Sequence, residues 1–415
     1  MKVAIIGAGI SGLSIAQLLE KNGHTAVIFE SDNKPGGLIK CERVSGSLFH
    51  STGGHVFNTK RKDVLEWFWK YFNRETEFTK TDRNAAVYLA ADQIIPYPIE
   101  NYIYLLDEDT IKSFINDLTG MIKKGNNFQV DNFEDFLKNR FGTTLYKLYF
   151  QPYNYKVWRR DLRKIPLSWL EGKLPMPTVE ELIYNNINHV KEQTFVHSSF
   201  YYPKQDGSQF IANRFAEDLN ILYNSTVNKI EYIKQTKQWS VNQMMFDRVI
   251  FCGNIKQLPK IVENIDILPF ITDIESLEYH GTTSVFCEID KNPYSWIYQP
   301  DRVHESHRII CTGNFAESNN SDEKLTGTIE FTDFIGEDDI IQNLKKMPYN
   351  PNYITHHYAK YTYPIQHKNT REMISTLKKD VENYGLYLHG RFAEWEYYNM
   401  DVAIGAAIDL IKRFK

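Results

Sequence analysis

The chain has 415 residues, of which 42% are hydrophobic and 14% aromatic, so it is long enough for roughly two or three domains with substantial cores. Its formal net charge of −4 gives no indication of nucleic acid or an anionic membrane as a general partner. The four cysteines form no C-x-x-C pair, and we interpret them as reduced thiols. The chain opens on a predicted strand rather than a secretory signal and has no apolar run of membrane-spanning length, so we expect a soluble, cytoplasmic protein without membrane insertion.

The N-terminal stretch predicts a strand, a glycine turn, a helix and a second strand. Residues 2–6 form a short apolar run that is typical of a buried parallel strand. They lead into Gly7-Ala8-Gly9-Ile10-Ser11-Gly12, and apolar residues at helical spacing follow up to Leu19. A second apolar run, residues 25–29, ends at Glu30. This order predicts a Rossmann-like dinucleotide-binding unit.

The glycines and the acid of this unit each have a physical task. Gly7 permits the tight turn, Gly9 lets the backbone approach a pyrophosphate, and Gly12 lets helix and strand pack closely. The start of the helix offers free N–H groups and the positive end of its dipole to phosphates. The carboxylate of Glu30 is placed to accept hydrogen bonds from a ribose diol.

Two further glycine turns narrow the choice of cofactor. Pro35-Gly36-Gly37-Leu38 follows the second strand, and residues 51–57 contain Gly53-Gly54-His55. A Gly-Gly pair gives the backbone a second close approach to a diphosphate. The arrangement resembles FAD enzymes of the amine oxidase and UDP-galactopyranose mutase superfamily, which implies that His55 lies against the flavin ring. Taken alone, His55 is better explained as a loop histidine that caps a strand end, whereas the neighbouring glycine turns favour the flavin.

The middle of the chain predicts an inserted helical domain. Residues 60–98 combine a helix at 63–72 with strand-like stretches. From about residue 102 to 190 the pattern is helical, with apolar residues three and four apart in 133–141 and 144–150. Because this block interrupts the nucleotide-binding pattern, we interpret it as an insertion.

The insertion contains an aromatic motif, Phe150-Gln151-Pro152-Tyr153-Asn154-Tyr155-Lys156-Val157-Trp158. An aromatic run standing alone is as easily a packing block in a core. Here it resembles the R-P-Y-x-x-K-x-W signature of UDP-galactopyranose mutases, which implies that Tyr153 and Trp158 bracket the uracil of a nucleotide sugar. The following stretch, residues 170–175, resembles a mobile loop that closes over the diphosphate. It carries Lys173 where the eukaryotic-type mutases have an arginine.

Strand character returns after the insertion. Residues 199–208 precede a helix predicted at 209–220 and resemble a turn near the flavin ring, and residues 227–230 resemble a strand that meets the adenine. Residues 246–254 resemble the strand that closes the FAD domain. Short alternating runs at 283–288, 295–298, 307–312 and 326–331 predict a mainly antiparallel sheet. The resemblance implies that Arg308 grips the diphosphate, whereas the commoner role of such an arginine is a surface ion pair.

The C-terminal residues 390–401 match a G-R-x-x-x-x-x-Y-x-x-M-D pattern of the same family. The resemblance places Gly390 and Arg391 at the flavin diphosphate, Tyr397 at the substrate phosphates, and Asp401 beside the flavin. Asp401 is also explained as an acid at a helix N-terminus, where the helix dipole favours it.

These patterns together predict an α/β fold: a Rossmann-like FAD-binding domain with an inserted helical domain and a mainly antiparallel β-sheet domain. The expected FAD-binding domain is discontinuous and comprises residues 1–58, 208–255 and 386–415. The expected helical domain comprises residues 99–195, and the expected sheet domain comprises residues 59–98, 196–207 and 256–385.

The resemblance implies an isomerase that interconverts the pyranose and furanose forms of a nucleotide sugar, with UDP-galactopyranose or a close relative as the substrate. In this family the reduced flavin attacks the anomeric carbon through its N5 atom and expels the nucleoside diphosphate, and NAD(P)H or another reductant activates the enzyme. The alternative functions are an FAD-dependent oxidase or desaturase of the amine oxidase or protoporphyrinogen oxidase type, and a non-catalytic protein that binds a nucleotide sugar. The sequence leaves open the sugar, the nucleotide and a homo-oligomer.

The candidate residues follow from the motifs. We expect catalytic roles for Arg308, Lys173 and His55. We expect substrate contacts from Tyr153, Trp158, Tyr202, Tyr361, Tyr363 and Tyr397. We expect the FAD to lie against Gly7, Gly9, Ile10, Ser11, Gly12, Glu30, Gly37, Leu38, Gly54, His55, Val227, Gly390, Arg391 and Asp401. The sequence suggests no metal site.

Overall fold

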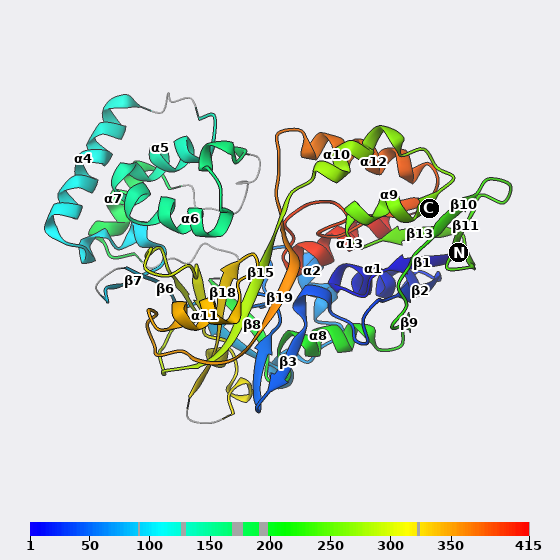
Figure 1. Cartoon of the computed structure of the whole chain (residues 1–415), viewed down its shortest axis with the longest axis horizontal. Helices are drawn as coiled ribbons and strands as arrows, with labels where there is room; N and C mark the ends of the chain where they lie inside the picture. Colours follow the sequence, from blue (N-terminus) through cyan, green and yellow to red (C-terminus); the bar gives the residue numbers. More distant parts are fainter. Residues whose placement is uncertain (90–91, 126–129, 168–176, 191–197, 322–323, 415) are drawn as a thin grey trace.

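The computed structural model describes residues 1–89, 92–125, 130–167, 177–190, 198–321 and 324–414. A five-stranded parallel sheet forms the core of the part that contains both chain ends (Figure 1). In spatial order its strands are β20 (Leu386–Leu388), β13 (Arg248–Phe251), β1 (Lys2–Ile6), β2 (Thr25–Phe29) and β9 (Asn220–Leu222). The sheet is therefore assembled from segments far apart in the sequence.

Strand β1 is apolar throughout because both faces of the sheet are covered. Val3 and Ile5 belong to the apolar cluster on one face, whereas Ala4 and Ile6 belong to the cluster on the other. Successive side chains of a strand point to opposite faces, so each face of β1 receives alternate residues. The strands expected at 2–6 and 25–29 are confirmed.

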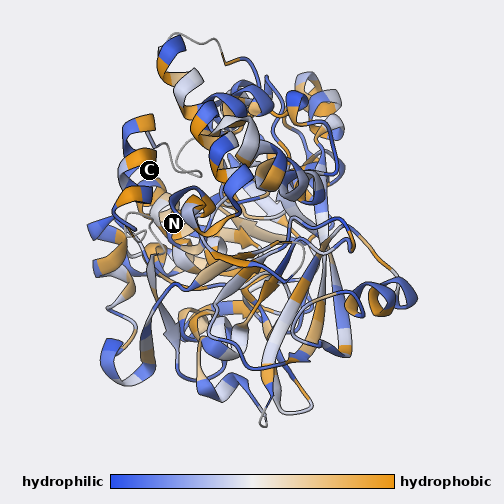
Figure 2. Ribbon diagram, turned by 90° about the vertical axis from the view of Figure 1, so that its left-hand side faces the viewer, coloured by the Kyte–Doolittle hydropathy of each residue, from blue (hydrophilic) through white to orange (hydrophobic). Residues whose placement is uncertain are grey.

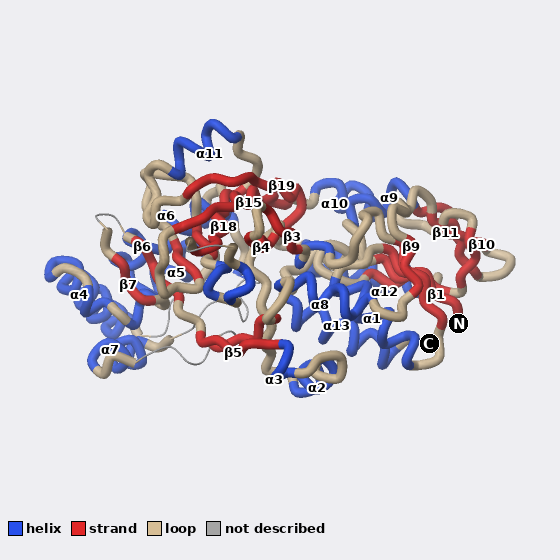
Figure 3. The backbone as a smooth tube through the Cα atoms, turned by 90° about the horizontal axis from the view of Figure 1, so that it is seen from below, coloured by secondary structure: helices blue, strands red, loops and turns tan. Residues whose placement is uncertain are grey.

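Helices and a small sheet cover the two faces (Figure 3). The face that carries Val3 and Ile5 packs against α1 (Ile10–Lys21), α2 (Lys62–Phe68), α8 (Gly207–Ala216) and α13 (Met400–Arg413). The other face packs against α9 (Leu258–Ile261), α10 (Ile271–Ser276), α12 (Thr370–Glu382) and a four-stranded sheet of β12 (Met244–Phe246), β11 (Gln238–Val241), β10 (Ile230–Ile233) and β14 (Val262–Glu263). This is the layered Rossmann-like arrangement that the glycine motif predicted.

A second sheet of seven strands lies between the parallel sheet and the helical insertion (Figure 1). In spatial order its strands are β19 (Asn352–Pro364), β15 (Tyr279–Ile289), β18 (Leu325–Thr332), β17 (Arg308–Ile310), β16 (Trp296–Tyr298), β6 (Ala85–Tyr88) and β7 (Ile94–Pro96). Neighbouring strands are antiparallel except for β16 and β6, which are parallel. The expected mainly antiparallel sheet is confirmed.

Short elements flank the two large sheets. Strands β3 (Cys41–Val44) and β4 (Ser47–His50) form a hairpin, and β5 (Phe78–Asp82) pairs antiparallel with β8 (Ser199–Pro203), which follows the insertion in sequence. Helix α3 (Arg74–Glu77) precedes β5, and α11 (Glu337–Leu344) packs against β19.

The described part of the helical insertion includes α4 (Glu108–Lys124), α5 (Phe133–Leu145), a short π-helix (Tyr146–Phe150), α6 (Gln151–Trp158) and α7 (Val179–Ile187). Side chains of Asp107, Asn132 and Thr178 cap the N-termini of α4, α5 and α7. Apolar residues lie in the strands and on the inward sides of the helices (Figure 2), and one continuous cluster joins the insertion to the seven-stranded sheet. No described helix is both long and apolar enough to cross a membrane.

Several predicted element boundaries differ from the structure, and side-chain hydrogen bonds to the backbone lie beside three of them. The helix expected to reach residue 72 ends at Phe68, and Arg214 Nη1 donates to the Tyr71 carbonyl at 2.6 Å. The helix expected to reach residue 220 ends at Ala216, where Gln17 Nε2 donates to the carbonyls of the last turn. The strand expected from residue 227 begins at Ile230, because the Asn242 side chain bonds the preceding backbone instead.

The three-part domain division stays a proposal, and packing refines it. Helix α2 lies against α13, and helix α12 lies against β20. Both helices contribute to the apolar clusters around the parallel sheet, although the sequence assigned residues 59–98 and 256–385 to the sheet domain. We therefore propose that α2 and α12 belong to the nucleotide-binding part.

Candidate active site

The first two glycine turns touch each other at the C-terminal edge of the parallel sheet. A Cβ atom on Gly12 would lie 1.9 Å from the Gly7 carbonyl oxygen, so only glycine fits there. The Gly36 N–H donates to the Ala8 carbonyl at 2.9 Å, and a Cβ atom on Gly37 would lie 3.1 Å from the Gly9 Cα atom. The close contact leaves bare backbone facing the adjacent cavity, as a diphosphate site requires.

Glu30 lies at the same edge with 8% of its surface exposed. Its Oε2 atom accepts the Ala8 N–H at 2.7 Å, and its Oε1 atom accepts the Asp32 N–H at 2.9 Å. These bonds orient the carboxylate toward the cavity and leave lone pairs for a hydroxyl donor. The arrangement fits the ribose of a dinucleotide.

A cavity of about 250 Å³, here called the glycine cavity, runs along this edge. Its lining residues are Gly7, Gly9, Ile10, Ser11, Gly12, Glu30, Gly36, Gly37, Leu38, Ile39, His55, Cys252, Arg391, Phe392, Tyr398, Met400 and Ala403. Backbone N–H groups, the start of α1 and a buried carboxylate thus face one space. The residues present fit a dinucleotide cofactor such as FAD.

A second cavity of about 220 Å³ adjoins the first, and we call it the arginine cavity. The two cavities share the lining residues Leu38, His55, Arg391, Tyr398 and Met400. The arginine cavity is further lined by Thr52, Gly53, Gly54, Val56, Arg83, Trp296, Tyr298, Arg308, Thr362, Tyr363, Tyr397 and Asn399. A group bound along the glycine turns would therefore meet a second ligand at the shared wall.

Arg308 forms a buried ion pair with Glu330 at one side of the arginine cavity. The two residues are direct partners across strands β17 and β18, and the Arg308 Nε atom donates to Glu330 Oε2. Glu330, only 1% exposed, also accepts the Gly53 N–H at 3.0 Å. Although burial by itself raises the pKa of Glu330, Arg308 and His307 hold this pKa well below its usual range. Arg308 thus has a carboxylate partner, but the pair is buried rather than on the surface.

Arg391 lies against two stacked tyrosines. The rings of Tyr363 and Tyr397 are 5.7 Å apart and within 9° of parallel, and the Arg391 guanidinium lies 4.2 Å from the Tyr397 ring centre. Arg391 donates to the carbonyls of Thr362 and Tyr398. Its buried Nε atom has no hydrogen-bond partner among the described residues. The Arg308 Nη2 atom also reaches the Tyr363 hydroxyl at 3.2 Å, so the two arginines share one tyrosine pair.

His55 stands where the two cavities meet. Burial, followed by the nearby charge of Arg391, lowers the pKa of His55 to about 4, so the ring is neutral near pH 7. Its buried Nε2 atom has no hydrogen-bond partner within the described part of the chain. Behind it, the His55 N–H donates to His50 Nδ1 at 3.4 Å, and His50 Nε2 pairs with the Tyr202 hydroxyl at 2.7 Å. Tyr202 is fully buried and lies outside both cavities, so it supports the His55 turn from behind.

Sequence reasoning missed Arg83 and Glu330. Arg83 precedes β6, and its guanidinium lies 5.2 Å from the Trp296 ring centre and 5.3 Å from that of Tyr97. Its Nη2 atom donates to the Tyr298 hydroxyl. Nothing in the local sequence marks Arg83, because the parallel pairing of β6 with β16 alone brings it to the cavity.

The aromatic motif of α6 lies beside the arginine cavity. The Tyr153 ring stacks on Tyr149 at 5.4 Å and meets the edge of Tyr298, a cavity residue, at 5.5 Å. Trp158 is 3% exposed, and it lies in the apolar cluster between the insertion and the sheet. The structure therefore brings Tyr153 close to the cavity and keeps Trp158 in the core.

The other predicted residues lie as follows. Gly390 (φ 102°) lies so close to Ser11 that a Cβ atom on residue 390 would be 2.6 Å from the Ser11 Oγ atom. Asp401 lies in the first turn of α13, and burial raises its pKa. Tyr361 packs against Tyr279, and Val227 packs against the apolar cluster of the parallel sheet; both lie outside the two cavities. Lys173 lies outside the described residues.

Comparison with known proteins agrees with this geometry. Residues 5–73 match the NAD(P)-binding Rossmann-like domain. The chain is 28% identical over 195 residues to the UDP-galactopyranose mutase of Mycoplasma pneumoniae, covering 43% of this chain and 46% of that protein. It is 30% identical over 179 residues to the dTDP-fucopyranose mutase of Escherichia coli, covering 42% of this chain and 46% of that protein. These alignments thus span about half the length of the relatives.

Solved structures extend the likeness to the whole chain at the level of fold. A crystal structure of reduced UDP-galactopyranose mutase superposes with a TM-score of 0.87 at 19% identity, covering 99% of this chain and 93% of that one. A putative protoporphyrinogen oxidase from Exiguobacterium superposes with a TM-score of 0.75 at 13% identity, covering 99% and 98%. The predicted α/β fold is confirmed, and the chain is related to proteins named UDP-galactopyranose mutase and dTDP-fucopyranose mutase and has the fold of UDP-galactopyranose mutase.

Proposed function

We propose that the chain is an FAD-dependent isomerase that interconverts the pyranose and furanose forms of a nucleotide sugar. The observation that carries the proposal is the adjoining pair of cavities. One is built from bare glycine backbone and a buried carboxylate, and the other is lined by the cations Arg83, Arg308 and Arg391. Two relatives are themselves named as mutases of nucleotide sugars, which supports the same function.

The glycine cavity would hold the cofactor. Gly9, Gly37 and the first turn of α1 would face the diphosphate of FAD, and Glu30 would face its ribose. His55, and Gly54 from the adjoining arginine cavity, would face its ring system. Reduced flavin, when bound, supplies a nucleophilic nitrogen for the anomeric carbon of the sugar. NAD(P)H or another reductant of the same power would keep it reduced.

The arginine cavity would hold the diphosphate that leaves the anomeric carbon and later returns to it. Arg308 donates to Glu330 through Nε and to the Tyr363 hydroxyl through Nη2. The other N–H groups of its guanidinium are available for phosphate oxygens. Hydrogen bonds between charged groups are about twice as strong as neutral ones, which stabilises a diphosphate as its negative charge grows. The Tyr363 and Tyr397 hydroxyls would supply further donors.

The base of the nucleotide would lie along α6. Tyr149 and Tyr153 form a stacked pair beside Tyr298, and a flat base packs well on such a surface. Trp158 supports this wall from the core. We propose a UDP-sugar as the substrate, with UDP-galactopyranose as the first to be tested. We further propose that Lys173 approaches the diphosphate from its loop and that Asp401 and Val227 border the cofactor.

The test is incubation of the purified, FAD-loaded protein with UDP-galactopyranose under anaerobic conditions, with and without dithionite. The expected result is a furanose product that forms only with reduced enzyme and consumes no stoichiometric reductant. Lys173→Ala should lower the rate at least about tenfold, whereas Lys173→Arg should retain it, since arginine and lysine both carry the required charge. In a parallel aerobic assay with NAD(P)H, consumption of O₂ or of one NAD(P)H per turnover would instead identify an oxidoreductase.

A further inference from the structure

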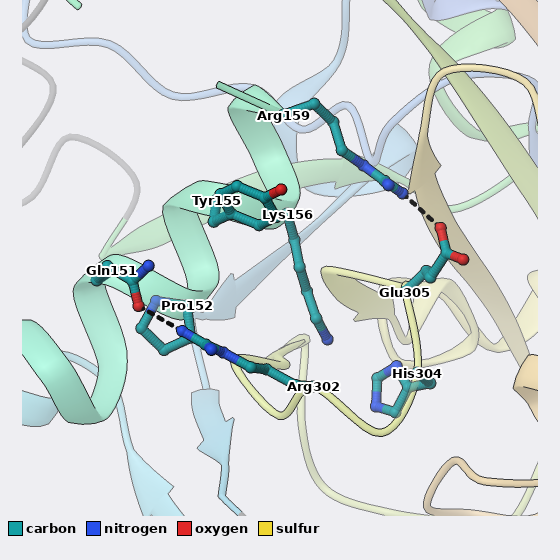
Figure 4. Close-up of a pocket in the computed structure, with 8 residues that line it drawn as sticks. All are labelled: Gln151, Pro152, Tyr155, Lys156, Arg159, Arg302, His304 and Glu305. Atoms are coloured by element: carbon teal, nitrogen blue, oxygen red, sulfur yellow. Dashed lines mark hydrogen bonds and ion pairs between the residues drawn. The ribbon is translucent and has the colours of Figure 1, made fainter. Parts of the chain in front are cut away.

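A third cavity of about 370 Å³ opens on the outer face of α6, away from the aromatic surface that carries Tyr153. We call it the lysine cavity, and Figure 4 shows its lining residues. They come from two segments: Gln151, Pro152, Tyr155, Lys156 and Arg159 from α6 and its C-terminus, and Arg302, His304 and Glu305 from the connection between β16 and β17. The cavity shares no lining residue with the arginine or glycine cavity.

Positive charge is concentrated in the lysine cavity. Its lining contains three basic side chains, Lys156, Arg159 and Arg302, and one acidic side chain, Glu305. Arg159 pairs with Glu305 at 2.7 Å, whereas Arg302 donates to the neutral Gln151 Oε1 atom at 2.7 Å. The charge of Arg302 is therefore oriented by a hydrogen bond but not neutralised.

Lys156 is only 7% exposed, so its ammonium group lies in the protein interior. Its Nζ atom donates to the Gln299 carbonyl at 2.9 Å and to the Ser306 carbonyl at 2.8 Å. An ammonium has three N–H donors, so one remains for a ligand. Burial without a carboxylate in direct contact is unfavourable for the cation and lowers the pKa of Lys156 to about 7.

His304 is a second buried polar side chain of the lysine cavity with unused hydrogen-bonding capacity. It is 4% exposed, it lines the cavity, and neither ring nitrogen makes a hydrogen bond of normal geometry to a described residue. Burial and the nearby Lys156 lower the pKa of His304 to about 3, and a weak backbone interaction with Ser306 does not offset them. A neutral ring with two unpaired nitrogens is costly in a buried place, unless a ligand supplies a partner.

We propose that the lysine cavity binds a small phosphorylated metabolite, with its phosphate between Lys156, Arg302 and His304 and its uncharged part against Tyr155. A tetrahedral dianion accepts hydrogen bonds from several directions and would satisfy the donors that the protein leaves open. The Tyr155 ring is 56% exposed at the cavity wall and offers a flat apolar surface to a sugar or an aromatic group. The size of the cavity is in the range of small-molecule sites.

Sulfate is the first probe, because it keeps two negative charges at every pH used. The expected result is saturable binding by calorimetry with a dissociation constant below about 10 mM. Arg302→Gln, at the surface and outside the core, should weaken binding at least about tenfold. Arg163→Gln is the matched control: this arginine is exposed, pairs with Asp161 and lies outside the cavity. Phenyl phosphate should bind more tightly than sulfate, and Tyr155→Ala should remove the difference.

The pH dependence gives an independent readout. Sulfate binding should weaken as the pH rises through about 7, because Lys156 loses its proton there and His304 stays neutral. Among the described residues, the charged or titratable groups around the Lys156 ammonium include Arg159, Asp301, Arg302, His304, Glu305 and His307. The proposal is overturned by retention of full sulfate affinity in Arg302→Gln, by pH-independent affinity between roughly pH 6 and pH 8.5, or by the absence of saturable binding.

Discussion

Arg308 and Glu330 stand opposite each other on paired strands, and their side chains form an ion pair beside the arginine cavity. Glu330 is almost fully removed from water, and Arg308, His307 and the Gly53 N–H compensate its charge. A buried pair is strongly unfavourable when one partner is removed, so each residue fixes the position of the other. Glu330 therefore positions Arg308 and, through Gly53, also the turn that carries His55.

We expect Glu330→Gln to lower both stability and turnover. Loss of the buried charge leaves Arg308 without its partner, which should cost about 3 kcal/mol in the free energy of unfolding at neutral pH. The displaced guanidinium should lower the rate at least about tenfold, which corresponds to 1.4 kcal/mol of lost transition-state stabilisation. Urea unfolding and steady-state rates of FAD-loaded enzyme measure the two effects. A variant with the wild-type rate would show that the pair is only structural.

The contribution of Glu330 should also depend on pH. Because its pKa is held below the usual range, its stabilisation is complete above the unfolded-state pKa of about 4.3 and is lost as the pH falls below that value. The difference in unfolding free energy between the wild type and Glu330→Gln should be constant from about pH 7 to pH 5.5 and should shrink below about pH 4. A difference that grows on acidification would contradict this sign.

Gly12→Ala should abolish cofactor binding. The added Cβ atom would overlap the Gly7 carbonyl, so either the turn or the start of α1 must shift. The purified variant should be colourless and take up no added FAD, as judged by flavin absorbance. Gly120→Ala is the control, because a Cβ atom there meets nothing within 4 Å. It lies inside α4, and it should bind FAD normally and gain about 0.5–1 kcal/mol from helix propensity.

Arg83→Lys should raise the KM for the nucleotide sugar at least about tenfold, with a smaller effect on kcat. A lysine keeps the charge but loses the planar group that lies over Trp296 and Tyr97 and binds the Tyr298 hydroxyl. Flavin content and unfolding midpoint, measured alongside, separate this effect from misfolding. An unchanged KM would remove Arg83 from the substrate site.

Residues with local tasks were predictable from the sequence, and residues placed by distant pairing were not. Gly7, Gly9 and Gly12 act within one strand-turn-helix unit, so their spacing alone identifies them. Arg83 reaches the site only because β6 pairs with β16, and Glu330 only because β18 pairs with β17. Neither pairing leaves a mark in the local sequence. Family patterns located Arg308 and Arg391, but they did not reveal that Tyr202 lies behind the site rather than in it.

A matched pair of variants should show that Tyr153 acts in nucleotide binding and Trp158 in stability. Tyr153 stacks beside the arginine cavity, and base stacking is worth about 1–3 kcal/mol, so Tyr153→Ala should weaken binding of UDP roughly ten- to hundredfold while the fold persists. Trp158 lies in the core, where truncation costs about 3–5 kcal/mol, so Trp158→Ala should mainly lower the unfolding midpoint.

Titration of UDP against flavin fluorescence, with urea unfolding of the same samples, distinguishes the two roles. Trp158→Phe is the conservative control, because it keeps an aromatic ring in the cluster and should recover most of the stability. A large loss of UDP affinity in Trp158→Phe with an unchanged midpoint would mean that the indole itself contacts the nucleotide. In that case α6 must move relative to the sheet when substrate binds, since the indole is only 3% exposed in this structure.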